Sequence, residues 1–252
     1  MRLAVYQFAL AEEPFWPRVE ARLASAAHAG AEEHRVRDHL AVAVGLVAVD
    51  HPTRVGIDGP PAAGKTTLAD ELAAVLRAEG RDVIRATIEG FLFPRAQRYR
   101  RGEYSALACY HDNHDYDALN RVLLEPLGPG GDRRFRSAVY DRAADISLSL
   151  PPSTAAADAV LVFDGVFLQR PELAGGWDLR VFVSTPFEET VARARVRERG
   201  AMSAEEVERR WRERYIPSQR IYFAAVSPLD HADVVVHNDV PQHPTWELRT
   251  GG

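Results

Sequence analysis

The stretch Gly59-Pro60-Pro61-Ala62-Ala63-Gly64-Lys65-Thr66 decides how the rest of the chain is interpreted, because it fits the pattern G-x-x-x-x-G-K-[ST] at every fixed position. An apolar run, Val55–Ile57, precedes it, and a helical pattern with Leu68, Leu72 and Leu76 follows it. Glycines allow the backbone to wrap closely around an anion, and the N–H groups at the start of the next helix point at bound phosphates. The stretch therefore predicts a phosphate-binding loop between a strand and a helix.

Lys65 and Thr66 are the polar side chains of this loop. Lys65 is the only lysine in the chain, since all the other cations among the 31 Lys and Arg residues are arginines. We expect Lys65 to hold the outer phosphates of a nucleotide as a point charge, and Thr66 to offer its hydroxyl group to Mg²⁺. The residues expected to contact the nucleotide are Gly59, Pro60, Ala62, Ala63, Gly64, Lys65, Thr66 and Thr67.

Short apolar runs alternate with helical patterns from residue 53 onward. The runs are Val55–Ile57, Val83–Ile88, Ala159–Phe163, Leu179–Val183 and Val234–Val236. Apolar strands separated by helices are typical of a parallel sheet that is covered on both faces, so the sequence predicts an α/β fold with about five strands. Val36, Leu40 and Val44 have helical spacing and predict a helical extension over 1–52, while 241–252 is expected to be a C-terminal tail.

The composition argues against several classes of protein. The longest apolar stretch, residues 40–49, is far shorter than the roughly 20 residues that a membrane-spanning helix needs. Glu12 and Glu13 follow the first ten residues, so we expect no signal peptide. The net charge of −5 argues against nucleic-acid binding, and the single Cys109 fits a reducing cytoplasm. We expect a soluble cytoplasmic protein without membrane or nucleic-acid partners, and homo-oligomer formation stays open.

Two carboxylates are expected beside the phosphate-binding loop, because the carboxyl ends of parallel strands meet at one edge of a sheet. Asp164 ends the apolar run 159–163, where it would hold Mg²⁺ directly or through water. Glu89 ends the run 83–88, where it would accept the proton of an attacking hydroxyl group. Either residue could instead be an ordinary turn carboxylate, and Glu89 could help to hold the metal.

Further motifs follow the loop in a fixed order. They are Ile57-Asp58-Gly59 through Thr67, Glu89–Phe91, Tyr116-Asp117-Ala118-Leu119, Val139-Tyr140-Asp141, Val162-Phe163-Asp164-Gly165 and Ala232-Asp233-Val234-Val235-Val236. With these motifs, residues 55–238 resemble the uridine–cytidine kinase family, whose relatives include phosphoribulokinase and bacterial pantothenate kinase. The resemblance implies a P-loop NTPase-type kinase domain over 53–240 that uses ATP and Mg²⁺ to phosphorylate the 5′-hydroxyl group of a nucleoside.

The resemblance also implies roles for residues of a predicted acceptor-side insertion over 91–150. Glu89, just before it, stands where the family has an aspartate general base. Asp112 matches the aspartate that grips the ribose, and Tyr140 matches a tyrosine beside the base. The family's base-reading histidine does not recur after Tyr140-Asp141, where Arg142 follows instead.

Two groups of arginines flank these motifs. The first group, Arg193, Arg195, Arg197 and Arg199, predicts a lid over 193–203, with Arg193 and Arg197 as the candidates that stabilise the transferring phosphoryl group. The second group consists of Arg95, Arg98, Arg100 and Arg101. This second group is either a solvated loop or a clamp for an anionic acceptor, in which Arg95 and Arg98 would contact the substrate.

The sequence thus predicts an ATP-dependent kinase that acts on a hydroxyl group of a small, nucleoside-like molecule, such as uridine or cytidine. One alternative keeps the same chemistry on a sugar phosphate or on a hydroxylated natural product, including a nucleoside antibiotic. The other alternative is a non-catalytic, nucleotide-dependent switch, which would bind ATP without transferring phosphate to a small alcohol.

Overall fold

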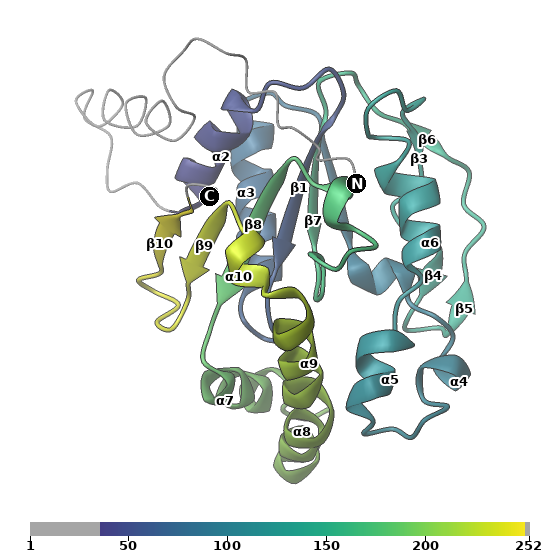
Figure 1. Ribbon diagram of the computed structural model, residues 1–252, viewed down its shortest axis with the longest axis vertical. Coiled ribbons are helices and arrows are strands. Elements are labelled where there is room, and N and C mark those ends of the chain that lie inside the picture. The colour runs from purple at the N-terminus through teal and green to yellow at the C-terminus, as the bar shows by residue number, and fades with distance from the viewer. Residues whose placement is uncertain (1–35, 250–252) are drawn as a thin grey trace.

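The computed structural model describes residues 36–249 (Figure 1). Most of the predicted N-terminal helical extension lies outside these residues. Its last part forms α2 (Val36–Leu46), which does not stand apart from the main domain but packs into its core against α3 (Lys65–Ala78). None of the described helices is both long and apolar enough to cross a bilayer.

The centre of the fold is a six-stranded sheet with the order β10-β9-β8-β1-β7-β2. The parallel strands coincide with the predicted apolar runs; they are β1 (Thr53–Asp58), β2 (Val83–Thr87), β7 (Val160–Asp164), β8 (Leu179–Ser184) and β9 (Val234–His237). The α/β fold class is confirmed, and the sixth strand is the correction to the expected number.

The sixth strand, β10 (Thr245–Leu248), lies in the segment that was expected to be a tail. It pairs antiparallel with β9 at the edge of the sheet. Trp246 and Leu248 pack against the core, and the Trp246 ring lies 4.4 Å from the His39 ring of α2. Two apolar residues in alternation are too short a pattern to predict a strand, so this element depends on contacts with α2 and β9.

The side chains of the central strands alternate between the two faces of the sheet. In β7, Val160 and Val162 pack with α2 and α3, whereas Leu161 and Phe163 pack on the opposite face. That opposite face is covered by α5 (Ala106–His111), by α6 (Tyr116–Leu119) with its continuation Asn120–Leu124, and by α9 (Ile216–Val226). Helices therefore cover both faces, as the alternating pattern predicts.

Two groups of elements extend beyond the carboxyl ends of the parallel strands (Figure 1). One belongs to the insertion and contains α4 (Arg95–Arg98), α5 and a small antiparallel pair, β4 (Tyr140–Asp141) with β5 (Ile146–Ser147). A second small pair, β3 (Arg134–Phe135) with β6 (Ser153–Thr154), is not part of this group and lies near the opposite end of the sheet. The other group contains α7 (Phe187–Arg197) and α8 (Ala204–Arg210), which lead through Trp211–Tyr215 into α9, while α10 (Pro228–His231) precedes β9.

Gly56 of β1 provides a test of how tightly this core is built. A Cβ atom at Gly56 would lie 2.7 Å from the buried Trp177 ring, whose Nε1 donates to the carbonyl oxygen of Leu168. We expect Gly56→Ala to lower the free energy of unfolding by about 1–3 kcal/mol, because the ring must shift. Urea unfolding followed by circular dichroism measures this change.

Gly45 is the matched control, because it lies in α2 with open space around its missing Cβ atom. Gly45→Ala should leave the protein equally stable or more stable, by up to about 1 kcal/mol, since alanine favours a helix. Equal unfolding midpoints for Gly56→Ala and the wild type would contradict the packing argument.

Candidate active site

The phosphate-binding loop joins β1 to α3 in a backbone conformation that requires glycine at both ends. Gly59 and Gly64 have φ angles of 145° and 103°. A Cβ atom at Gly59 would lie 2.3 Å from the carbonyl oxygen of Val183. A Cβ atom at Gly64 would lie 2.4 Å from Nδ2 of the Asn238 side chain. The loop can therefore wrap an anion only with glycine at these positions.

Asn238 also holds the loop from outside. Its side-chain amide donates to the carbonyl oxygen of Ala63 at 2.7 Å, and the Thr185 hydroxyl donates to the same oxygen at 3.3 Å. This carbonyl is therefore held from outside the loop, and the N–H groups of Gly64 and Lys65 that follow it lie at the N-terminus of α3. This is the arrangement that binds phosphate at a helix N-terminus.

Lys65 is buried, and its ammonium group donates to the carbonyl oxygen of Pro60 at 2.6 Å. Burial lowers the pKa of Lys65 to about 8, although the negative charges of Asp164, Asp58 and Glu89 act in the opposite direction. The ammonium group thus lies over the loop at the position where outer phosphates would be bound.

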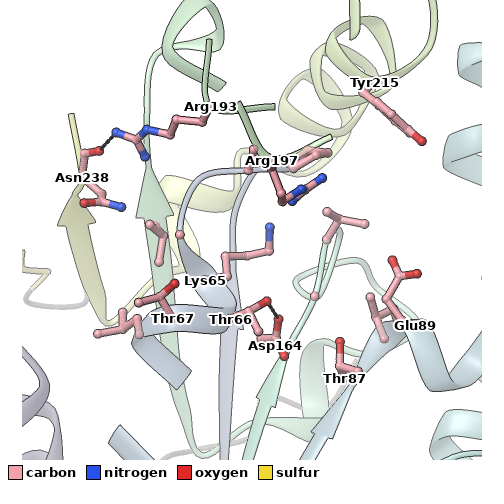
Figure 2. A pocket seen from close by; sticks show the side chains of 18 of the residues that line it. Lys65, Thr66, Thr67, Thr87, Glu89, Asp164, Arg193, Arg197, Tyr215 and Asn238 are labelled. Carbon is pink, nitrogen blue, oxygen red and sulfur yellow. Dashed lines mark hydrogen bonds between the residues drawn. The ribbon is translucent and has the colours of Figure 1, made fainter. Parts of the chain in front are cut away.

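Thr66 and Asp164 meet beside Lys65, at the point where α3 begins and β7 ends (Figure 2). The Thr66 hydroxyl donates to Oδ2 of Asp164 at 2.6 Å, and Nη2 of Arg85 lies 2.7 Å from Oδ1. Hydroxyl and carboxylate oxygens are ligands that Mg²⁺ accepts together with nucleotide phosphates. Among residues 36–249, no group of three or more His, Cys, Asp or Glu side chains is placed to hold a metal ion.

A single cleft of about 1770 Å³ connects the phosphate-binding loop to the insertion. Ligand pockets in proteins usually measure about 300–1,000 Å³, so this cleft has room for a nucleotide and a second small molecule. Its wall includes the start of α3, the ends of β2 and β7, part of α7 and the polar side of α9. The predicted site residues that line it are Ala62, Gly64, Lys65, Thr66, Thr67, Glu89, Arg98, Asp164, Arg193 and Arg197.

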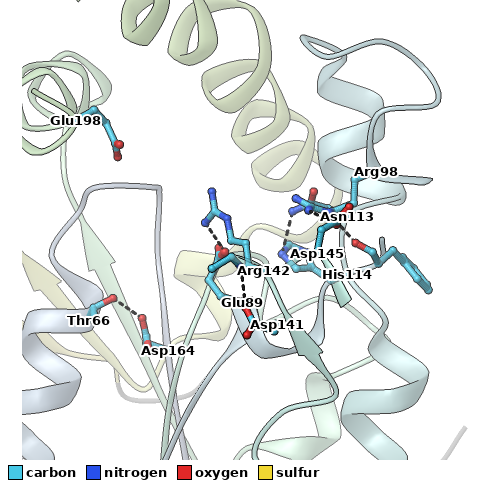
Figure 3. Close-up of polar contacts among 12 residues, drawn as sticks. Thr66, Glu89, Arg98, Asn113, His114, Asp141, Arg142, Asp145, Asp164 and Glu198 are labelled. Carbon is cyan, nitrogen blue, oxygen red and sulfur yellow. Dashed lines mark hydrogen bonds and ion pairs between the residues drawn. The ribbon is translucent and has the colours of Figure 1, made fainter. Parts of the chain in front are cut away.

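Glu89 faces this cleft beyond Asp164, and Arg142 lies next to it (Figure 3). Nη1 of Arg142 donates to Oε2 of Glu89 at 2.5 Å. The negative charge of Glu89 is the main reason that the pKa of the Arg142 guanidinium is raised. The predicted base is thus in the cleft, and its carboxylate is engaged by an arginine that the sequence did not single out as a contact.

The two predicted lid arginines occupy different surroundings (Figure 2). Arg193 donates to the carbonyl oxygens of Ala63 at 3.3 Å and of Asp239 at 3.1 Å, and also to that of Asn238. Arg197 is exposed and pairs with Glu198 at 2.8 Å, and its charge contributes to the lowered pKa of Lys65. Arg193 thus holds the phosphate-binding loop through its carbonyl oxygens, whereas Arg197 lines the cleft on the side of Lys65.

Three predicted acceptor contacts do not line the cleft. The Asp112 carboxylate is held by Arg100 at 3.0 Å and by Arg101 at 2.6 Å. The buried Tyr140 donates its hydroxyl to Asp145, and the guanidinium of Arg95 lies 5.4 Å from the Tyr99 ring. Gly59, Pro60 and Ala63, which were predicted to contact the nucleotide, are buried and also lie outside the cleft lining.

The cleft wall also contains polar residues that the sequence analysis missed. Gln219 is 1% exposed, and neither its amide nitrogen nor its oxygen has a hydrogen-bond partner. Arg214 and His114 are buried on the same wall. In the sequence, Gln219 lies four residues after Tyr215, which follows Val207 and Trp211 at the same four-residue spacing. That spacing is the one sequence signal that could have found it.

Asp58 lies below the loop and ties three segments together. Its carboxylate accepts hydrogen bonds from the Gly59 N–H at 2.7 Å, the Leu168 N–H at 3.1 Å and the Tyr222 hydroxyl at 2.5 Å. Burial raises the pKa of Asp58 to about 6, although the hydrogen bonds from Tyr222 and Gly59 and the charge of Lys65 favour the ionised form. The start of the loop, the segment after β7 and α9 are therefore held by one carboxylate.

Comparison with known proteins places this fold and cleft in context. A family model described as the cytidylate kinase-like family matches residues 54–239. No curated protein sequence matches the chain. Among solved structures, a possible uridine kinase from Bacillus stearothermophilus has a TM-score of 0.62 at 24% identity, over 79% of this chain and 96% of that one.

Two further solved structures show the same fold at lower identity. A proposed fructose transport system kinase from Silicibacter sp. TM1040 has a TM-score of 0.63 at 21% identity, over 77% of this chain and 96% of that one. D-glycerate 3-kinase from Cryptococcus neoformans has a TM-score of 0.53 at 12% identity, over 95% and 100%. These likenesses confirm the predicted resemblance to uridine kinase-like P-loop kinases at the level of the fold.

The hydrogen bond from Tyr222 to Asp58 leads to a pH-dependent prediction. Because the pKa of folded Asp58 is about 6, its carboxyl group is mostly protonated at pH 5 and ionised at pH 8. An ionised carboxylate loses more when a donor is removed, so Tyr222→Phe should cost about 1–3 kcal/mol of stability at pH 8 and less at pH 5. Calorimetric unfolding at both pH values measures the difference.

Tyr110 offers a control, since its ring packs edge-on against Phe167, as the Tyr222 ring does. Its hydroxyl does not bond Asp58, so Tyr110→Phe should show the same effect at both pH values. A Tyr222→Phe penalty that does not change between pH 5 and pH 8 would contradict the role given to Asp58.

Proposed function

The chain belongs to the cytidylate kinase-like family, and on that premise we propose that it transfers the γ-phosphoryl group of ATP to a hydroxyl group of a small molecule. One observation carries the proposal. A single cleft holds the phosphate-binding loop with Lys65 and, beyond Asp164, the carboxylate of Glu89. A phosphate site and a candidate base in one cavity are what a hydroxyl phosphotransferase requires.

The phosphate-binding loop and Lys65 would bind the β- and γ-phosphates of ATP. Thr66 and Asp164 would hold Mg²⁺, since their oxygens are adjacent and face the cleft. The ion would offset the negative charge of the phosphates during transfer. Arg197, which lies near Lys65, would add positive charge on the lid side, whereas Arg193 would act by keeping the loop in place.

The transfer step uses Glu89 as the proton acceptor. The acceptor oxygen forms a bond to the γ-phosphorus, and the bond between the γ-phosphorus and the bridging oxygen of ADP breaks. The bond electrons leave with ADP, and the hydroxyl proton passes to a carboxylate oxygen of Glu89. Positioning of the two reactants supplies most of the rate increase in such a reaction, because the protein forms no covalent intermediate.

The proposal also concerns the class of small molecule that carries the accepting hydroxyl group. A uridine- or cytidine-like nucleoside follows from the resemblance, but its expected contacts, Asp112 and Tyr140, do not line the cleft. A sugar phosphate or a hydroxylated natural product fits the same chemistry. The buried free thiol of Cys109 is compatible with activity in the cytoplasm.

An acceptor panel tests the proposed function. The protein is incubated with labelled ATP, Mg²⁺ and either uridine, cytidine, ribose phosphates or pantothenate, and labelled products are identified by mass spectrometry. Labelled phosphate on an acceptor hydroxyl group supports the kinase. ATP binding without transfer to any small alcohol would favour a nucleotide-dependent switch.

Lys65 gives the first prediction about this reaction. Lys65→Ala should abolish phosphoryl transfer, and thermal unfolding should show that the fold is retained. In the wild type, ATP affinity should fall as the pH rises through about 8, because the free lysine must regain its proton to bind phosphate. Calorimetric titration at pH 7 and pH 9 measures this dependence, and Lys65→Ala should remove it.

Arg77 is a control cation, since it is exposed on the same helix and does not line the cleft. Arg77→Ala should keep both the activity and the pH dependence of ATP binding. If the Lys65→Ala variant transferred phosphate at the wild-type rate, the role proposed for the phosphate-binding loop would be wrong.

Glu89 gives the second prediction. Glu89→Gln should lower turnover by about 10²-fold or more, with little change in ATP affinity, because the amide cannot accept the proton. Glu89→Asp should also be slower, since a shorter side chain moves the carboxylate away from its position in the cleft. Steady-state kinetics and nucleotide titration separate the two effects.

Glu71 provides the control carboxylate, because it lines the cleft and pairs with Arg37 rather than with an acceptor-side residue. Glu71→Gln should stay within a few-fold of wild-type turnover. Glu89→Gln with undiminished turnover would show that another group takes the proton.

A further inference from the structure

Arg214 is a buried positive charge on the acceptor end of the cleft. It is 3% exposed and follows α8 within Trp211–Tyr215. Its Nη1 donates to the carbonyl oxygens of Glu103 at 3.0 Å and Ser105 at 3.1 Å, and its Nη2 donates to Oδ1 of Asn113 at 3.4 Å. The guanidinium lies 4.9 Å from the Tyr99 ring centre. Within residues 36–249, no carboxylate forms an ion pair with it, so its charge is desolvated without being neutralised.

Arg98 is a second buried arginine at this end. It is 7% exposed, and its Nε donates to the carbonyl oxygen of Phe93 at 2.7 Å. The nearest carboxylate, that of Asp145, lies 3.7 Å from Nη2, and it also accepts from the Tyr140 hydroxyl and from the backbone N–H of Arg95. Arg98 is therefore only partly compensated.

The surroundings of His114 are positively charged, although His114 itself is neutral. It is 2% exposed, and Asn113 and Tyr116 contact its two ring nitrogens. Burial lowers the pKa of His114 to about 3, and the charges of Arg170, Arg98, Arg214 and Arg142 lower it further. The ring stays neutral, and the positive charge around it comes from arginines.

Arg142 differs from these buried arginines because its partner can be exchanged. Its side chain is 59% exposed, and the Glu89 side chain with which it pairs is 44% exposed. Ion pairs that water can reach contribute little to stability. An incoming anion can therefore compete with Glu89 for this guanidinium.

These charges lie on the side of the cleft away from the phosphate-binding loop. Figure 3 shows Thr66 and Asp164 on one side of Glu89, and Arg98, Asn113 and His114 on the other. A nucleotide seated on the loop leaves this end to the acceptor. The predicted clamp residues Arg100 and Arg101 are not available for it, because both bind Asp112.

We propose that the acceptor carries an anionic group, a phosphate or a carboxylate, besides the hydroxyl that receives phosphate, and that Arg142 and Arg214 bind this anionic group. The proposal rests on the proposed function for the identity of the reaction. A guanidinium matches either anion with two parallel N–H donors. When Arg142 turns to the anion, it releases Glu89, so binding of the correct acceptor frees the base.

The first experiment measures anion binding without catalysis. The phosphate-binding loop is filled with a non-hydrolysable ATP analogue and Mg²⁺, and inorganic phosphate is titrated by calorimetry. We expect saturable binding that Arg142→Gln weakens by at least about 10-fold, as the loss of a charge-assisted pair predicts. Arg142→Lys should bind with intermediate affinity, because it keeps the charge but not the paired donors.

Arg134 is the matched control, since it is an exposed arginine of the same insertion and does not line the cleft. Arg134→Gln should bind phosphate as the wild type does. Absence of saturable binding, or equal affinity in Arg142→Gln and the wild type, overturns the proposal. Arg142 carries the test because it is exposed, whereas replacement of the buried Arg214 could disturb folding.

The second experiment compares neutral acceptors with close analogues that carry a phosphate or a carboxylate. The sets are glycerol with glycerol 3-phosphate and D-glycerate, and ribose with ribose 5-phosphate, in which every member keeps free hydroxyl groups. We expect the anionic member to have a kcat/KM at least about 10-fold higher, and Arg142→Gln to reduce this ratio towards one. The glycerol set separates phosphate from carboxylate.

The two experiments distinguish failure of this proposal from failure of the proposed function. Phosphate binding that depends on Arg142, without transfer to any acceptor, supports the anion site and refutes the kinase. Transfer that favours a neutral acceptor, with a ratio unchanged in Arg142→Gln, supports the kinase and refutes the anion site.

Discussion

The buried carboxylate of Asp58 is the interaction on which the cleft depends. It joins the start of the phosphate-binding loop, the segment after β7 and the middle of α9 through three hydrogen bonds. These segments are far apart in the sequence, and each contributes to the cleft wall. A buried carboxyl group needs its donors, so the loop, the strand-end segment and α9 must be placed together for any of them to be stable.

The parallel sheet then determines where chemistry can occur. Because β1, β7 and β2 are neighbours with one direction, the loop, Asp164 and Glu89 follow the same edge of the sheet in that order. The insertion and the α7–α8 segment extend beyond that edge on opposite sides (Figure 1), and residues of both line the cleft. The order along the edge therefore sets the order in the cleft: phosphate site, candidate metal site, candidate base and acceptor end.

The loop, Asp164 and Glu89 could be predicted because each occupies a position that local sequence defines, either a fixed spacing or the end of an apolar strand. The acceptor end could not be predicted in this way. Four arginines close together in the sequence suggested a clamp, but Asp112 engages Arg100 and Arg101 across a turn, whereas Arg214 reaches the cleft from the far side of the chain. Gln219 and β10 likewise depend on contacts between distant segments, which periodicity alone does not reveal.

The pairing of Arg142 with Glu89 links recognition of the acceptor to the chemistry. While Nη1 of Arg142 donates to Oε2 of Glu89, that carboxylate oxygen is occupied and is not free to contact the acceptor hydroxyl. A neutral acceptor would leave this pair intact, whereas an anionic acceptor offers Arg142 a competing partner. Discrimination would then appear in the transfer step as well as in binding, because the interaction with the anion is coupled to the state of the base. The exposed pair is weak enough for exchange, and the buried Arg214 keeps positive charge in place while Arg142 moves.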